Sequence, residues 1–243
     1  MTKTAAVIPA RYASTRFPGK PLAKIAGKPM IQWTCEQATA SIADIVLVAT
    51  DDMRIKKAVE SFGFKAVMTS EAHQSGTDRI AEAIHDIDAD LIINLQGDEP
   101  ILPPDVIDRL ITKMTECPEL EMATVAVPGQ FGSEEYNDPN TVKVVKDVTG
   151  KALYFSRSPI PHMRNSPKNT TCFFHWGIYA YRRDFLEEYI RWPQSELEKI
   201  ESLEQLRALE NGASIQVITT NQKALGVDVP EDIAKVEKFL KQV

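Results

Sequence analysis

The sequence predicts an α/β fold, in which helices cover a mostly parallel sheet. The order of the elements carries this prediction, because short apolar runs alternate with segments whose apolar residues recur at helical spacing. Hydrophobic residues make up 43% of the 243 residues and charged residues 26%, an ordinary globular balance that argues against disorder. A chain of this length is sufficient for one large domain or for one domain with a modest insertion.

The first half of the chain follows a regular strand–helix order. The apolar residues 5–8 predict a buried first strand, which a basic loop follows. Pro29 suits the first turn of a helix, and Asp51 can cap the helix that follows the second strand. We predict strands at 45–50, 65–68 and 90–96, and helices at 29–40, 78–87 and 103–116.

The pattern changes after residue 122, where connections become longer. We predict strands at 122–127, 142–146, 152–155, 174–181 and 214–219, helices at 183–191 and 198–210, and a last helix from Pro230. The expected organisation is an α/β core over 1–124 and 212–243, with a smaller region, 125–211, inserted into it.

Charge and cysteine content exclude several classes of protein. Lys and Arg number 28 against 34 Asp and Glu, giving a net charge of −6, which does not suit a general binder of nucleic acids or membrane surfaces. The chain has three cysteines, Cys35, Cys117 and Cys172, and their spacing is not that of metal ligands. An odd number fits reduced thiols of the cytoplasm better than a framework of disulfides. No apolar run approaches the length of a membrane span, so we expect a cytoplasmic protein.

A basic loop, residues 9–21 with the sequence PARYASTRFPGKP, follows the first predicted strand. Ligands of open parallel sheets bind beyond the carboxyl ends of strands, where this loop lies. Arg11, Arg16 and Lys20, together with exposed backbone amides, suit a triphosphate. Position and charge favour this function over a solvated basic loop. The P-loop and dinucleotide-binding glycine patterns are both absent.

Two acidic motifs are candidates for a metal site. Asp98, in the motif LQGDEP, follows the fourth predicted strand and could coordinate a hard cation that is held against phosphate oxygens. Glu99 would be a helper or a structural acid. Asp228 precedes the last helix in GVDVPED. Spacing alone leaves a helix-capping role open for each, but as a pair they make a two-carboxylate magnesium site plausible.

Seven motifs together resemble one enzyme family, the 3-deoxy-manno-octulosonate cytidylyltransferases, or CMP-Kdo synthetases. The resemblance runs from Val7 to Asp232, with the motifs in family order: PARYASTRFPGKPL, HQSGTDR, NLQGDEP, ALYFSR, GIYAY, LEQLR and GVDVPED. It implies a Rossmann-like nucleotidyltransferase fold, a homodimer, CTP as substrate and Mg²⁺ as cofactor. The core would then bind the nucleotide, and region 125–211 would bind the sugar and form the dimer surface.

The resemblance also assigns roles to single residues. The implied nucleotide-binding residues are Ala10, Arg11, Arg16, Lys20, Ser75, Gly76 and Gln96, and the implied metal ligands are Asp98 and Asp228. The implied sugar-binding residues are Gln96, Arg157, His175, Tyr179, Glu204 and Gln205. Trp176 and Val229 depart from the family pattern, which has an aliphatic residue and a Thr there.

Arg157 and His175 are the sugar residues with the clearest alternatives. A planar Arg can grip the carboxylate of Kdo bidentately, although a lone Arg after an aromatic strand is often a surface residue. His175 could equally be an ordinary half-buried histidine, and we do not expect it to bind metal.

The implied reaction is in-line attack of the sugar's anomeric hydroxyl on the α-phosphate of CTP, with loss of pyrophosphate. Such transfers depend on positioning and charge neutralisation, which makes Arg11, Lys20, Asp98 and Asp228 the expected catalytic residues. The sequence identifies no general base. The alternatives are transfer to another acid sugar, such as sialic acid or a Kdo variant, and a silent nucleotide-binding module. The pathway role implied by the resemblance is lipopolysaccharide biosynthesis.

Overall fold

The computed structural model describes residues 2–14, 17–165, 170–222 and 225–242. The chain divides into two compact units, Met1–Ile111 with Ala224–Val243 and Thr112–Lys223. Within the described ranges, no helix has the length and apolar character needed to cross a membrane.

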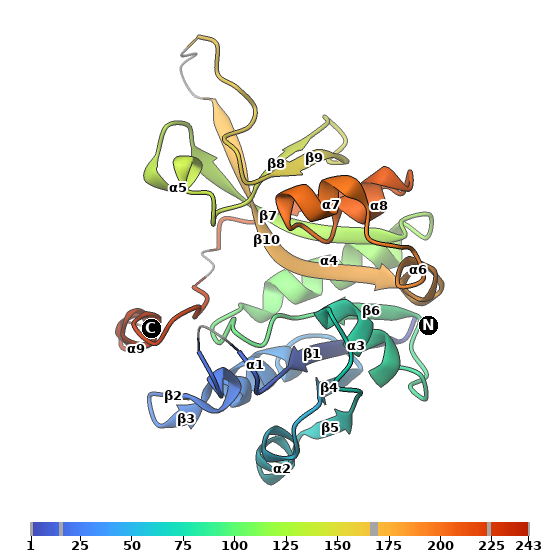
Figure 1. The fold of residues 1–243 in the computed structure, drawn as a ribbon, viewed down its shortest axis with the longest axis vertical. Coiled ribbons are helices and arrows are strands. Elements are labelled where there is room, and N and C mark those ends of the chain that lie inside the picture. Colours follow the sequence, from blue (N-terminus) through green and yellow to red (C-terminus); the bar gives the residue numbers. More distant parts are fainter. Residues whose placement is uncertain (1, 15–16, 166–169, 223–224, 243) are drawn as a thin grey trace. The chain divides into compact units, whose positions relative to one another are not determined.

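The first unit is built on four parallel strands (Figure 1). Their order is β6 (Leu91–Asn94), β1 (Thr4–Ala10), β4 (Ile45–Thr50) and β5 (Lys65–Met68). Residues 5–8 of β1 have no exposed surface, as expected for a central strand with both faces covered. The predicted α/β class with a mostly parallel sheet is confirmed.

The helices and short elements of this unit fill the connections between the strands. They are the 3₁₀ turn η1 (Lys20–Leu22), the hairpin β2 (Lys24–Ile25) and β3 (Lys28–Pro29), and the helices α1 (Met30–Thr39), α2 (Met53–Ser61), α3 (Gly76–Ala83), α4 (Pro104–Glu116, which continues into the second unit) and α9 (Asp232–Leu240). The C-terminal helix belongs here because buried Val236 packs with Ile25, Met30, Ile101 and Val227.

The expected cap of α2 is wrong by one residue. Asp52, not Asp51, has the extended backbone of an N-cap, and its carboxylate accepts a hydrogen bond from Arg54 N at 2.8 Å. The Asp51 carboxylate instead accepts from Arg79 Nη2 at 2.6 Å, so this side chain forms a long-range ion pair and does not cap the helix.

The second unit is mainly antiparallel. The long strand β10 (Thr171–Arg182) pairs with β7 (Met122–Gln130), with a register shift between Trp176 and Tyr179. On the other side of β7, β11 (Ile215–Thr219) runs parallel to it. The hairpin of β8 (Lys143–Lys146) and β9 (Ala152–Ser156) pairs with β10 through β8. The helices are α5 (Glu134–Asn137), α6 (Arg183–Tyr189), α7 (Glu196–Glu201) and α8 (Leu206–Glu210).

The single helix predicted at 198–210 is wrong. The structure has two short helices, α7 and α8, because Ser202 adopts a left-handed conformation with φ 52° that ends α7. The break lets Glu198 of α7 fold back onto Arg207 of α8, with Arg207 Nε and Nη2 donating to its two carboxylate oxygens at 2.8 and 2.6 Å. Both side chains are only 6% exposed. The turn between the helices carries Glu204 and Gln205.

Candidate active site

The basic loop after β1 turns back toward the strand ends at Gly19. This residue has φ 71°, and a Cβ placed on it would lie 3.0 Å from the ring of Tyr12, so the turn suits glycine alone. Gly19 N donates to Tyr12 O at 2.9 Å. The loop thus places Lys20, the first residue of η1, opposite the end of β6.

Lys20 lies between the two predicted metal ligands. Its ammonium donates to Asp98 Oδ2 at 2.6 Å and to the Val227 carbonyl at 2.9 Å, and it lies 3.9 Å from Asp228 Oδ1. Exposure rises from 18% for the Lys20 side chain to 33% for Asp98 and 67% for Asp228. The structure therefore brings two carboxylates and one ammonium together at a partly open position. No cluster of three or more metal-ligating acids, histidines or cysteines occurs among the described residues.

These side chains line a cavity of about 280 Å³ in the first unit. Predicted residues in its wall are Ala10, Arg11, Lys20, Ser75, Gly76, Gln96, Asp98 and Asp228. The predicted residue Arg16 lies outside the described residues. The cavity combines cations, carboxylates and the amide of Gln96 at the ends of β1 and β6, the position at which open parallel sheets bind their ligands.

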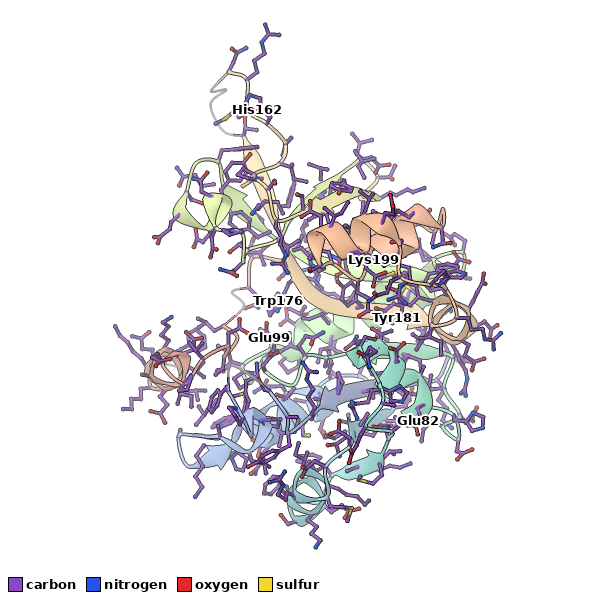
Figure 2. The ribbon with its side chains drawn as sticks, viewed as in Figure 1. Glu82, Glu99, His162, Trp176, Tyr181 and Lys199 are labelled. Carbon is purple, nitrogen blue, oxygen red and sulfur yellow. The ribbon has the colours of Figure 1, made fainter. Side chains whose placement is uncertain are left out.

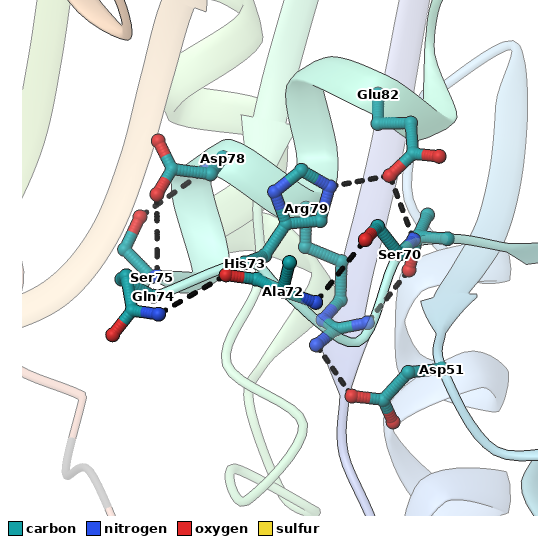
Figure 3. Close-up of polar contacts among 10 residues, drawn as sticks. Asp51, Ser70, Ala72, His73, Gln74, Ser75, Asp78, Arg79 and Glu82 are labelled. Atoms are coloured by element: carbon teal, nitrogen blue, oxygen red, sulfur yellow. Dashed lines mark hydrogen bonds and ion pairs between the residues drawn. The ribbon is translucent and has the colours of Figure 1, made fainter.

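One wall of the cavity comes from the segment 73–79, whose polar contacts are shown in Figure 3. Ser75 and Asp78 form a capping box that starts α3: Asp78 N donates to Ser75 Oγ at 3.1 Å, and Ser75 N donates to Asp78 Oδ2 at 3.3 Å. Glu82 fixes the loop before it by accepting from Ser70 N at 2.8 Å and by pairing with His73 Nε2. The Ser70 N–H and then His73 lower the pKa of Glu82, which keeps this anchor charged.

Arg79 is a residue of this wall that the sequence alone did not identify. It is only 4% exposed, donates to Thr69 Oγ1 at 2.6 Å and to Asp51 at 2.6 Å, and still lines the cavity. Ser14, His73 and Gln74 line it as well. The signal available was the HQSGTDR motif itself, in which Arg79 follows the predicted contact residues Ser75 and Gly76 by only a few positions.

The second unit holds five of the six predicted sugar residues, whereas Gln96 lines the cavity of the first unit. His175 Nε2 lies 2.9 Å from Thr124 Oγ1, and its ring centroid lies 5.0 Å from Phe155 and 5.4 Å from Tyr179. Burial lowers the pKa of His175 to about 3, so the ring is neutral at physiological pH. Burial, then Tyr181 and Glu204, raises the pKa of Tyr179, which stays a phenol.

Glu204 and Gln205 join this group through a row of rings. Tyr179, Tyr181 and Tyr189 stack in sequence with centroids 5.8 and 6.2 Å apart, and the Tyr189 hydroxyl donates to the Glu204 carbonyl at 2.7 Å. Gln205 is 3% exposed, and its side-chain Nε2 has no hydrogen-bond partner among the described residues. A buried amide nitrogen of this kind requires an acceptor, which a polyhydroxylated ligand would supply.

Of the two departures from the family pattern, Trp176 is buried and Val229 is half-buried. Trp176 is 3% exposed and lies next to the register shift of β10 (Figure 2). Val229 precedes α9, where its backbone N–H donates to Asp232 Oδ2 at 3.2 Å.

Comparison with known proteins identifies the family. A family model described as cytidylyltransferase matches residues 5–216. A 3-deoxy-manno-octulosonate cytidylyltransferase of Syntrophotalea carbinolica is 51% identical over 97% of this chain and 98% of its own length. This chain belongs to the 3-deoxy-manno-octulosonate cytidylyltransferase family. A member from Geobacter sulfurreducens is 49% identical over 97% of this chain and 98% of its own length.

A solved structure extends the likeness to three dimensions. The structure of CMP:2-keto-3-deoxy-manno-octonic acid synthetase complexed with CTP matches with a TM-score of 0.95 and 46% identity, covering 99% of both chains. The resemblance and the fold predicted from the sequence are confirmed by this match.

Proposed function

We propose that this chain transfers CMP from CTP to 3-deoxy-D-manno-octulosonate, releases pyrophosphate, and so activates Kdo for lipopolysaccharide biosynthesis. The observation that carries the proposal is the cavity beyond β1 and β6, where Arg11, Lys20, Asp98 and Asp228 converge. Family membership and a structural relative solved with CTP support the same nucleotide and sugar.

The cations of the cavity would bind and orient the triphosphate. Lys20 and Arg11 neutralise phosphate charge, which favours a transition state with charge spread over the phosphoryl oxygens. The anomeric hydroxyl attacks the α-phosphate, and pyrophosphate leaves on the opposite side. Lys20 would reach the phosphates by giving up its contact with Asp98, to which its ammonium donates at 2.6 Å. Arg16 is proposed to add a third cation.

Asp98 and Asp228 are proposed to hold Mg²⁺. Their fit is supported by the shared ammonium of Lys20, which shows that both carboxylates can face one cation. Mg²⁺ in phosphate-handling sites takes one or two carboxylates and completes its coordination with phosphate oxygens and water, so two acids suffice. When bound, the ion supplies charge neutralisation at the phosphates.

The acid sugar is proposed to contact Gln96, Arg157, His175, Tyr179, Glu204 and Gln205. Support comes from the buried Gln205 amide nitrogen and from the neutral His175 ring, which can donate or accept a hydrogen bond.

We further propose that residues 1–124 with 212–243 bind the nucleotide and that residues 125–211 bind the sugar and form a homodimer contact. The cytoplasm is the proposed compartment, since Cys35, Cys117 and Cys172 are free thiols. The dimer is tested by light scattering of the purified protein.

The deciding experiment measures pyrophosphate release by purified protein with CTP, Mg²⁺ and fresh Kdo. Asp98→Asn, which keeps the side-chain shape, should lower the rate by about a hundredfold or more, because it removes a charge at the phosphates. ATP, GTP and sialic acid serve as substrate controls. Release with sialic acid instead of Kdo would move the proposal to another acid sugar. CTP binding without release from any sugar would leave a silent nucleotide-binding module.

A further inference from the structure

The guanidinium of Arg157 is held rigidly by backbone carbonyls. Nε donates to Glu201 O at 2.7 Å, Nη1 to Pro139 O at 3.0 Å and Nη2 to Ser202 O at 3.3 Å. Arg has five N–H groups, so three are used by the described protein and two are left for a ligand. The plane of the guanidinium is fixed by three contacts, two of which cap the end of α7.

The backbone on either side of this guanidinium is fixed as well. Glu201 uses both carboxylate oxygens: Oε1 accepts from Ser156 Oγ at 2.5 Å, and Oε2 accepts from Arg157 N at 2.9 Å. This one side chain therefore attaches the end of β9 to the end of α7, three residues before Glu204. The Arg157 side chain and its backbone are thus bound to the same helix end.

Lys143 is a buried residue that contacts the backbone of Arg157. It has no exposed surface, and its ammonium donates to three carbonyls, Asp138 O at 3.0 Å, Thr141 O at 2.6 Å and Arg157 O. All three N–H groups of this buried ammonium have acceptors, so it needs no carboxylate partner. Burying a charge still costs free energy in comparison with burying an apolar side chain. Its contacts join the carbonyl of Arg157 to the turn 138–141, whose Pro139 carbonyl also accepts from the Arg157 side chain.

We propose that Lys143 and Glu201 are positioning residues that hold Arg157 in the orientation in which it binds the carboxylate of the acid sugar. The inference rests on the proposed function and on the sugar role of Arg157 within it. Lys143 fixes the Arg157 carbonyl and the 138–141 turn, and Glu201 fixes its N–H. Preorganisation of this kind favours binding, because the guanidinium loses little further freedom when the sugar arrives.

The test separates sugar binding from nucleotide binding and from folding. Glu201→Gln keeps the shape but places an amide where two acceptors are needed, and Lys143→Met keeps the apolar stem without the ammonium. Each should raise KM for Kdo by about tenfold to a hundredfold, as expected for a misplaced binding group, with KM for CTP unchanged within about twofold. Glu196→Gln and Lys199→Met are matched controls on exposed positions of α7, and they should leave both KM values unchanged. Lys199 is labelled in Figure 2.

A double-mutant cycle with Arg157→Lys tests whether the effect passes through Arg157. If Lys143 acts by positioning Arg157, Arg157→Lys combined with Lys143→Met should raise KM for Kdo little more than Arg157→Lys alone. Additive effects, or an equal rise in KM for CTP, would overturn the inference. If the wild-type enzyme is active and the variants have an unchanged KM for Kdo, the inference is wrong and the proposed function stands. If the wild type releases no pyrophosphate with any acid sugar, both the proposed function and this inference are wrong.

Discussion

Removal of either partner of the buried Glu198–Arg207 pair should destabilise the protein far more than loss of a surface ion pair. The two side chains make two hydrogen bonds of 2.8 and 2.6 Å, and each is 6% exposed. Glu198 Oε2 also accepts from Ser195 N at 3.1 Å, at the start of α7. The pair closes the turn that carries Glu204 and Gln205, so its loss affects the proposed sugar wall directly.

The magnitude follows from burial. A buried ion pair broken by removal of one partner typically loses about 3–5 kcal/mol, because the remaining charge is left without compensation. For a chain of this size, each kcal/mol lowers Tm by about 2–4 °C, so the fall should be roughly 6–20 °C. The exposed pair of Arg183 and Glu187 provides the comparison, since its side chains are 24% and 44% exposed. Glu187→Gln should cost only about 0.5 kcal/mol.

The assay is urea-induced unfolding followed by circular dichroism at pH 7, with the free energy of unfolding of each variant, Glu198→Gln and Arg207→Met, compared with that of the wild type. A loss below about 1 kcal/mol for both variants would refute the reasoning, because the pair would then behave as a surface contact.

Three further predictions follow from the contacts described. Lys20→Met should weaken CTP binding by about tenfold to a hundredfold in calorimetry, since the proposed charged donor to phosphate would be lost. Thr124→Val should raise KM for Kdo and leave KM for CTP unchanged, because the hydroxyl 2.9 Å from the His175 ring would no longer orient it. Because burial lowers the pKa of His175 to about 3, its NMR signals should not titrate between pH 5 and 8. In the unfolded chain, His175 binds a proton near pH 6.5. The contribution of the neutral His175 ring to the free energy of unfolding should therefore be lost as the pH falls from about 6.5 toward 3.

Local patterns in the sequence were sufficient to predict the main strands and the edge of the sheet at which Lys20 and Asp98 meet. The run at 5–8 is apolar because both faces of a central parallel strand are covered. The chain order of the strands then places Lys20 and Asp98 at one edge of the sheet, where the structure has their ammonium and carboxylate 2.6 Å apart. Such inferences need only the period of the apolar residues and the rule on strand ends.

Features that depend on one long-range partner could not be predicted in this way. The apolar period continues through Ser202, so no local signal marks the break between α7 and α8, which the Glu198–Arg207 pair stabilises. Asp51 and Asp52 are equally good caps by type, and only the distant Arg79 separates their roles. The acceptors of Arg157 are main-chain carbonyls, which every residue carries and no sequence pattern marks.

The charges of the cavity argue for a cation that accompanies the nucleotide. Arg11 and Lys20 supply two positive charges, and Asp98 and Asp228 supply two negative ones, so these four side chains sum to zero. Arg79 also lines the cavity, but its charge is already balanced by its ion pair with Asp51. A triphosphate carries about four negative charges at neutral pH, and a neutral group of side chains gives it little attraction. Asp98 also competes with the nucleotide for the Lys20 ammonium, which it already binds at 2.6 Å. A divalent cation taken by the two carboxylates would free Lys20 and make the group positive at the same time. CTP affinity should therefore rise steeply with Mg²⁺ in wild type but weakly in Asp98→Asn, and an equal rise in both would contradict this account.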